Sequence, residues 1–386
     1  MNDFLTVIGA GLAGAEAAWQ AAERGVKVVL YEMRPVVRNP VHKTENCAEL
    51  VCSNSLGNNL PHSAPFILKE ELRSFNSIII ASGDKNSVPA GSALAVDRDL
   101  FSQEITEKLA NHPNITIKRE EVVDIPQEDP VIIATGPLTS PKLSEQISKL
   151  IGQEYLYFYD ALSPIVNADS IDYDKAFFAS RYDKGDADYL NCPMSEEQYY
   201  TFIRELKAAE KMEFATFEKP AYFEGCMPIE VLADRGDRTL AFGPLKPVGL
   251  PDPKTGKIAY AVVQLRRENR DSSAYNLVGF QTKLTYPEQK RIFSMIPGLE
   301  NAEFFRLGAI HRNTFINSPS LLTNELQLKS RPGNYFAGQI TGVEGYVESS
   351  AMGLLASLSA VAKITGQAYT PPPADTALGA LINYLT

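Results

Sequence analysis

The sequence predicts an α/β protein in which a domain built on a parallel sheet is interrupted by an inserted α+β domain. Residues 4–32 open the chain with a strand, a helix and a second strand, a βαβ pattern that requires parallel strands. A strand, a glycine loop and a small-residue helix return at residues 333–366. Between about 155 and 305 the pattern is irregular, rich in Tyr and Pro, with short β-like runs. The first domain is therefore expected to be discontinuous.

The individual elements follow from local patterns. Residues 4–9 (FLTVIG) form an apolar run typical of a buried strand, residues 12–25 predict a helix that ends at Gly25, and residues 26–32 predict the second strand. Ser195, with Gln198 three residues later, predicts a capping box at the start of an amphipathic helix. Further helices are expected at 63–80 and 99–113, and further strands at 114–120, 130–136, 257–265 and 275–281.

Composition limits the class of protein. The 386 residues are enough for two domains, and 44% apolar content is that of an ordinary globular protein. There is no run of about 18 apolar residues and no charged-then-apolar leader, so we expect neither a membrane helix nor a secretion signal. Four cysteines do not make a disulfide scaffold, so a reduced cytoplasm is the expected location. No metal site is expected.

The net charge of −10 argues against nonspecific binding of nucleic acid by the whole surface. It leaves room for a local basic groove, because phosphate contacts need only a few well-placed cations. Candidate segments are residues 265–270 with Arg266, Arg267 and Arg270, residues 283–291, and residues 309–313. For each segment a solvated charged surface is the alternative.

A glycine motif predicts a dinucleotide site. Gly9, Gly11 and Gly14 form G-x-G-x-x-G between the first strand and the helix, where they allow a tight turn, close approach of a pyrophosphate, and close helix packing. Glu32 ends the second strand, where a carboxylate binds an adenosine ribose. The expected binding residues of this unit are Gly9, Ala10, Gly11, Leu12, Ala13, Gly14 and Glu32.

Two later segments favour FAD over NAD. Residues 131–136 and 335–342 resemble the strand-plus-glycine segments of two-domain, glutathione-reductase-like flavoproteins, the second lying beside the ribityl chain and flavin ring. A plain NAD dehydrogenase has no reason for that closing element. Many such flavoproteins have Asp where this chain has Gln339, whose amide can still bond a ribityl hydroxyl. The expected residues here are Gly136, Gly338, Gln339 and Gly342.

The cysteines leave two interpretations open. Cys47 and Cys52 have the spacing of the redox pair of the pyridine-nucleotide disulfide reductases. Against that class, the chain has no second glycine motif for a nicotinamide domain, no His-Pro near its end, and neither the glycine-rich lead nor the Pro-Lys tail of that redox helix. Cys47 and Cys192 are expected to be packing residues. Cys226 lies between Gly225 and Pro228, in a loop that can present its sulfur to a ligand.

The whole chain resembles the folate- and FAD-dependent tRNA (uracil-5-)-methyltransferases. The resemblance runs in consistent order from end to end, and its most specific segments are FEGCMPIE, HRNTFINSP and GQITGVEGYVES. It implies methylation of the T-loop uridine of tRNA, with carbon from 5,10-methylenetetrahydrofolate and electrons from NADPH or NADH through FAD. The same segments would serve a paralogue acting on ribosomal RNA. Family members usually continue some tens of residues beyond Thr386, so the resemblance covers no contact made by that tail.

The resemblance also implies residue roles. Carbon 5 of uracil becomes nucleophilic when a thiolate adds to carbon 6, and Cys226 is the implied nucleophile. Cys52 is implied to be its partner near the flavin, as an acid/base group or a flavin shield. Tyr346 is implied to lie against the flavin or the incoming base, and His311 and Asn313 are candidates to face the flavin–folate pocket. Residues 1–155 with 305–386 are then the FAD-binding domain, and residues 156–304 the inserted, RNA-facing domain.

Overall fold

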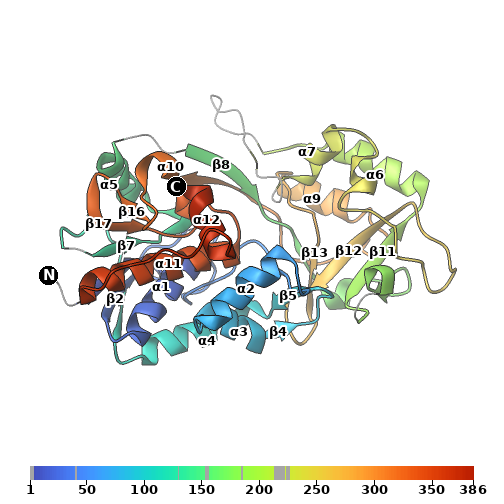
Figure 1. The fold of residues 1–386 in the computed structure, drawn as a ribbon. Helices are drawn as coiled ribbons and strands as arrows, with labels where there is room; N and C mark the ends of the chain where they lie inside the picture. The colour runs from blue at the N-terminus through green and yellow to red at the C-terminus, as the bar shows by residue number, and fades with distance from the viewer. Residues whose placement is uncertain are drawn as a thin grey trace.

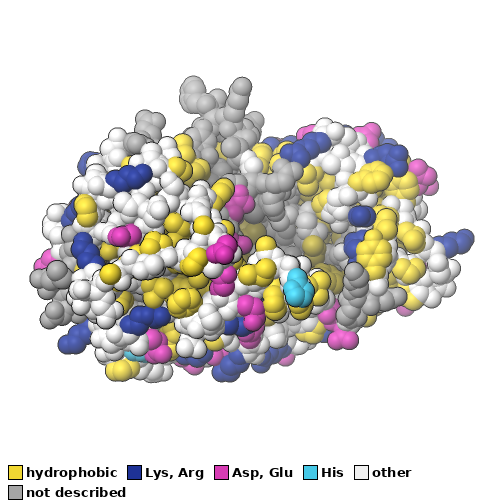
Figure 2. All heavy atoms as spheres, viewed as in Figure 1, with side chains coloured by type: hydrophobic (Ala, Val, Ile, Leu, Met, Phe, Trp, Pro, Cys, Tyr) yellow, Lys and Arg dark blue, Asp and Glu magenta, His cyan; other side chains and the backbone are white. Residues whose placement is uncertain are grey.

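The protein has two lobes, each built on a six-stranded sheet (Figure 1). The structure is a computed structural model, and it describes residues 4–39, 41–128, 130–152, 156–183, 186–212, 222 and 227–386. Cys226, the implied nucleophile, lies outside the described residues. Lys, Arg, Asp and Glu side chains are scattered over the face in Figure 2, so no block of one sign covers it.

The first sheet has the order β16-β17-β7-β1-β2-β6. β1 pairs in parallel with β2 on one side and β7 on the other, and β17 continues the parallel pairing beyond β7. The late strand β17 thus lies two places from the first strand of the chain, which confirms the expected return of the polypeptide to this sheet. The strands are β1 (Phe4–Ile8), β2 (Lys27–Glu32), β6 (Ile115–Arg119), β7 (Val131–Ile133), β16 (Gln327–Leu328) and β17 (Arg331–Phe336).

Helices α1 (Leu12–Glu23) and α11 (Tyr346–Thr365) pack closely against each other. Small residues permit this approach, since a Cβ on Gly353 would lie 2.1 Å from the carbonyl oxygen of Ala13. Ser357 Oγ donates to the carbonyl oxygen of Ala17 at 2.8 Å across the same contact. Among the described residues α11 is long and apolar enough to cross a membrane, but 78% of it is buried inside the protein, as in a core helix.

The first lobe also contains a small sheet and further helices, of which α5 (Pro141–Ile151) and α10 (Ser318–Leu321) pack in a separate hydrophobic cluster. A small sheet contains β3 (Ser55–Asn58), β4 (Ser87–Val88) and β5 (Ala93–Val96). The segment 63–80, expected as one helix, is α2 (Ala64–Ser74) and α3 (Ile78–Lys85). Asn76 has φ of 55° and Ser77 caps the new helix by accepting from the N–H of Ile80, so the chain turns between them. The other helices are α4 (Arg98–Asn111) and α12 (Ala377–Leu385).

The second lobe is an antiparallel sheet of order β10-β11-β12-β13-β9-β14 with its own hydrophobic core. The capping box at Ser195 and Gln198 is confirmed at the start of α6. Strands β8 (Leu156–Ala161) and β15 (Ile310–Phe315) pair as a separate ribbon. The domain limits 1–155 plus 305–386 and 156–304 stay a prediction. The elements are β9 (Ile165–Asn167), β10 (Phe177–Ala179), β11 (Tyr189–Met194), β12 (Ala261–Arg267), β13 (Ala274–Leu277), β14 (Phe304–Arg306), α6 (Glu196–Ala208), α7 (Ile229–Asp234), α8 (Thr239–Phe242) and α9 (Tyr286–Phe293).

Candidate functional site

A cavity of about 1030 Å³ lies where β1, β2, β7 and β17 end. Carboxyl ends of parallel strands are the usual position of a ligand in an open α/β sheet. Most of the residues expected to bind a dinucleotide line this one cavity, although they come from three distant parts of the chain. They are Gly9, Ala10, Gly11, Leu12, Ala13, Glu32, Gly136, Gly338 and Gln339, with Tyr346 beside them.

The glycine loop has the geometry that its motif predicts. Gly9 has φ of +96°, and a Cβ there would lie 2.7 Å from the carbonyl oxygen of Ala134. A Cβ on Gly14 would lie 1.7 Å from the carbonyl oxygen of Gly9, so this glycine shapes the loop without lining the cavity. Gly11 has no atom within 4 Å of a built Cβ and begins α1 without a side-chain cap. The first amides of α1 therefore offer an open anion site.

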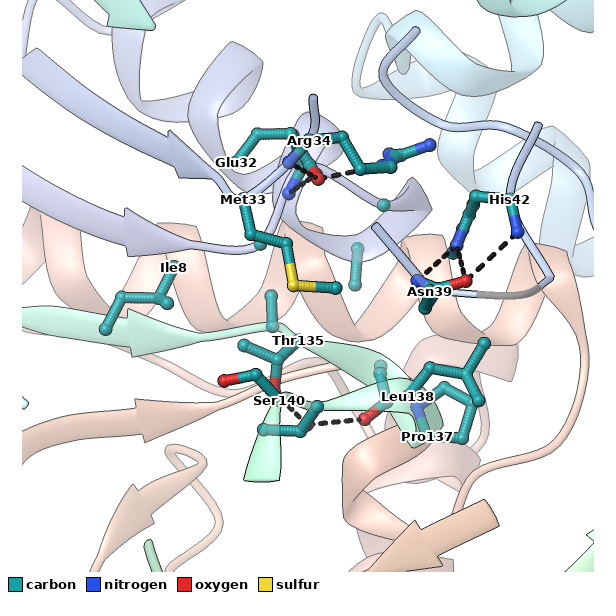
Figure 3. Close-up of a pocket in the computed structure, with 18 of the residues that line it drawn as sticks. Ile8, Glu32, Met33, Arg34, Asn39, His42, Thr135, Pro137, Leu138 and Ser140 are labelled. Carbon is teal, nitrogen blue, oxygen red and sulfur yellow. Dashed lines mark hydrogen bonds and ion pairs between the residues drawn. The ribbon is translucent and has the colours of Figure 1, made fainter. Parts of the chain in front are cut away.

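Glu32 closes the loop from the end of β2. One carboxylate oxygen accepts from the N–H of Ala10 at 3.1 Å, and the other accepts from the backbone N–H and from Nε of Arg34 (Figure 3). Burial raises the pKa of Glu32, but the hydrogen bonds and charge of Arg34 outweigh burial, so the pKa lies below its usual value. A carboxylate accepts up to about four hydrogen bonds, so ionised Glu32 retains capacity for a ribose hydroxyl.

Sequence reasoning missed the polar wall after β2. Arg34 also forms an ion pair with Glu49 at 3.0 Å. Asn39 and His42 bond each other beside the same cavity, as Figure 3 shows. Burial, with the charge of Arg34, lowers the pKa of His42 to about 4, so its imidazole is neutral at neutral pH. The signal available was Arg34 in "YEMRP", two residues after Glu32, the expected ribose carboxylate.

The closing segment brings a second helix start to the cavity. Gly338 has φ of +78° and lies so close to α1 that a Cβ would be 2.6 Å from Cβ of Ala13. α11 begins at Tyr346 after Gly345 and has no side-chain cap. Gly342 does not line the cavity. A Cβ built on it would lie 3.0 Å from Cδ2 of Phe315, so the glycine leaves room for that ring.

Tyr346 joins this helix to Cys52. Its hydroxyl oxygen accepts from the backbone N–H of Cys52 at 2.8 Å and of Ser53 at 3.2 Å. Burial raises the pKa of Tyr346, and the neighbouring Cys52 charge adds to this, so the phenol stays protonated. Cys52 is a partly exposed residue, and its sulfur lies 3.9 Å from the carbonyl oxygen of Ala161. The structure thus brings together two of the three expected catalytic residues.

Three arginines hold the segment around Cys52. Arg98 donates to the carbonyl oxygens of Leu50 and Cys52 and forms an ion pair with Glu268. Arg306 donates to the carbonyl oxygens of Val51 and Cys52 at 3.1 and 3.2 Å. Arg266 donates to Ser53 Oγ and Asn54 Oδ1 at 2.6 and 2.9 Å. Arg266 and Arg306 come from the second sheet, so both lobes fix the position of Cys52. Arg266 is therefore buried in this contact and is not part of a basic surface.

The other expected residues divide into buried and undescribed groups. Cys47 is fully buried and burial raises its thiol pKa, which weighs against its use as a redox thiol. Cys192 is buried in the second core, where its pKa rises to about 12. His311 and Asn313 share strand β15, and Asn313 is buried. The side chain of His311 lies outside the described residues.

One cavity is surrounded by the glycine loop, by the carboxylate of Glu32 and by the uncapped starts of α1 and α11. These features define a Rossmann-type flavoprotein of the FAD-binding class. The family model for glucose inhibited division protein A matches residues 5–368. The chain belongs to this family.

Relatives agree with this assignment, and a solved structure agrees with the fold. Methylenetetrahydrofolate–tRNA-(uracil-5-)-methyltransferase TrmFO of Citrifermentans bemidjiense is 60% identical over 387 residues, covering 100% of this chain and 89% of the relative. The protein of the same name from Listeria innocua is 59% identical with the same coverage. The structure of Aquifex aeolicus GidA superposes with a TM-score of 0.74 at 19% identity, covering 99% of this chain and 67% of that one, which supports the fold.

Proposed function

We propose that the protein methylates carbon 5 of the T-loop uridine in tRNA, using 5,10-methylenetetrahydrofolate as carbon donor, FAD as cofactor and NADPH or NADH as electron source. The observation that carries this proposal is the 57–61% identity, over 99–100% of the chain, to proteins named for that reaction. The described thiols are free, which suits a cytoplasmic enzyme.

The residues present fit FAD. Gly11 leaves open space before the amides of α1, which suits a pyrophosphate, and Glu32 stands where an adenosine ribose is bound. Gln339 and Tyr346, at the uncapped start of α11, line the same cavity, where they could contact a ribityl chain and flavin. Bound FAD would supply the electrons and, by analogy with the family, the carrier nitrogen for the methylene group.

The chain's own residues would prepare the uracil. Cys226 would add its thiolate to carbon 6, which makes carbon 5 nucleophilic, and would leave again when the proton at carbon 5 has been removed. Cys52 is proposed as the acid/base group for that proton. Tyr346, Arg98 and Arg306 fix the backbone on both sides of Cys52, so the sulfur is held in place before substrate arrives. His311 and Asn313 are proposed to face the folate.

The proposal is tested by product analysis. Purified, FAD-loaded protein is incubated with unmodified tRNA, methylenetetrahydrofolate and NADPH or NADH, and digested RNA is examined for 5-methyluridine. Cys226→Ala should abolish product while FAD stays bound, and RNA containing 5-fluorouridine should form a covalent adduct with Cys226. If 5-methyluridine forms in ribosomal RNA fragments but not in tRNA, the substrate is ribosomal RNA. If it forms in neither, the proposed activity is refuted.

A further inference from the structure

A second cavity, of about 910 Å³, lies beside the dinucleotide cavity. Glu49 and Val51 line both cavities, so the two are separated by one stretch of backbone. The wall of the second cavity comes from both lobes, with Lys43 and Arg98 on one side and Phe305 and Arg306 on the other. None of the described residues that are expected to bind FAD, folate or uridine lines this second cavity.

Two cations of this cavity have no acidic partner among the described residues. Lys43 is exposed, and its ammonium group makes neither an ion pair nor a hydrogen bond there. Arg306 uses two of its N–H groups on the carbonyl oxygens of Val51 and Cys52, and its Nε has no acceptor. Because guanidinium has five N–H donors, Arg306 keeps spare donors beside the cavity. Burial and the charge of Arg98 lower its pKa to about 10, and burial with the charges of Arg306 and Arg98 lowers the pKa of Lys43.

The acids of the wall are mostly committed elsewhere. Glu268 pairs with Arg98 at 2.5 Å. Glu49 pairs with Arg34 and accepts from the backbone N–H groups of Lys43 and Thr44. Asp97 caps α4 and accepts from the N–H of Arg270. Asp99, in the first turn of α4, is the remaining acid of the wall. The wall as a whole has four acids and three cations, so the positive charge without an ion-pair partner is local, at Lys43 and Arg306.

We propose that this cavity is a second binding site, for an oxyanion carried on a compact organic group. Lys43 and the partly buried Arg306 would hold a carboxylate or phosphate between them, because charge-assisted hydrogen bonds to such groups are stronger than neutral ones. The ring of Phe305, whose residue is 56% exposed, and the buried side chain of Leu50 would contact the apolar part. The inference does not depend on the proposed methyl transfer.

Binding of an oxyanion at this site would change the mobility of the Cys52 segment. The guanidinium that would contact the oxyanion is the same group that donates to the carbonyl oxygens of Val51 and Cys52. An anion on Arg306 would offset the repulsion from Arg98 and hold the arginine in place. The Cys52 segment would then be more rigid, and its thiol would react more slowly with an external reagent.

The test is binding of three probes to the FAD-loaded protein, so that the dinucleotide cavity is already filled. Inorganic phosphate, p-aminobenzoylglutamate and adenosine 2′,5′-bisphosphate are titrated by equilibrium dialysis. They distinguish a free anion, a folate tail and a nicotinamide dinucleotide as the source. At least one should bind saturably at one site per chain, and Lys43→Gln should weaken that binding about tenfold, as loss of one charge-assisted contact implies. Lys43 has no described side-chain partner, so this variant is expected to fold.

The matched control is Lys27→Gln, which removes the same charge from an exposed lysine at the start of β2. It should leave the affinity unchanged. In the wild type the bound probe should slow alkylation of Cys52 by iodoacetamide severalfold, and in Lys43→Glu the probe should have no such effect. The proposal is overturned if none of the three probes binds saturably, or if Lys43→Gln and Lys27→Gln bind as well as the wild type.

Discussion

At the scale of single residues, the hydroxyl group of Tyr346 is the feature with the clearest consequence. It accepts from two backbone N–H groups in a segment 293 to 294 residues away. Neither N–H has another acceptor described, so the phenol oxygen satisfies both. A stacking role for the ring stays a prediction, whereas the hydroxyl contact follows from the geometry.

Tyr346→Phe should therefore damage the Cys52 segment while preserving the ring. Two partly buried N–H groups lose their acceptor, and we expect the free energy of unfolding to fall by about 1–3 kcal/mol. FAD content should persist, and the rate of 5-methyluridine formation should fall at least tenfold, because Cys52 is no longer fixed. Chemical denaturation and single-turnover assays measure the two effects. Tyr384→Phe, at an exposed position on α12, is the control. Wild-type turnover in Tyr346→Phe would contradict this role.

Glu16 gives a pH dependence that can be measured. It is fully buried on α1 and accepts from Gln20, from Ser77 Oγ and from the N–H of Ile79. Burial raises its pKa from 4.5 to about 7, against those hydrogen bonds. The folded protein therefore keeps a proton that the unfolded chain has already released, so the contribution of Glu16 to stability is complete below pH about 4.5 and is lost as the pH rises through 7.

We expect the free energy of unfolding to decline between pH 5 and 8 by about 3 kcal/mol on account of this group. Urea denaturation of the wild type and Glu16→Gln across that range isolates the contribution, because other carboxyl groups are common to both proteins. The difference between the two curves should change with pH. Parallel curves would show that Glu16 does not titrate in this range.

At the scale of elements, the βαβ unit separates the structural from the binding glycines. Gly14→Ala would force a Cβ to within 1.7 Å of the carbonyl oxygen of Gly9, so we expect severe destabilisation. Gly11 has an ordinary φ of −70° and free space around a built Cβ. Gly11→Ala should fold with nearly unchanged stability and lose FAD affinity more than tenfold, because the methyl group occupies the place of the pyrophosphate. Thermal unfolding of the apoprotein and flavin fluorescence titration check both outcomes. Tight FAD binding by Gly11→Ala would place the pyrophosphate elsewhere.

The elements also show what local sequence can predict. The βαβ unit, the returning strand β17 and the capping box of α6 follow from periodicity, glycine spacing and cap residues, which act over a few positions. The break between α2 and α3 was missed, because Asn76 and Ser77 stop one helix and start another inside a continuous apolar pattern. Glu32 was predictable from its place at the end of a strand, whereas Arg34, Asn39 and His42 follow in irregular chain. The arginines that hold Cys52 were not predictable as a group, since three distant elements supply them.

At the scale of the whole molecule, the lobes are fastened together at the Cys52 segment. Arg266 of β12 is 8% exposed, and Asn54, which it contacts, is fully buried. Asn54 also donates to the carbonyl oxygens of Val96 and Arg267, so its amide joins both lobes. The basic residues at 265–270 thus include at least one whose role is to join the lobes and not to meet RNA.

Arg266→Met should expose this dependence. It leaves Oδ1 of buried Asn54 without its donor, and we expect a loss of about 2–3 kcal/mol in the free energy of unfolding together with slower turnover. Arg204→Met removes a largely exposed arginine whose ion pair spans 3.8 Å, and it should cost less than about 1 kcal/mol. Urea denaturation compares the two. Equal stability of both variants would mean that the contact of Arg266 does not hold the lobes.

Tyr346 is the first residue of α11. The turn of helix that borders the dinucleotide cavity also carries the hydroxyl that anchors Cys52. A flavin bound in the cavity and the sulfur of Cys52 would therefore be coupled through the side chain of Tyr346. The visible absorption spectrum of bound flavin should therefore report a displacement of the Cys52 thiol.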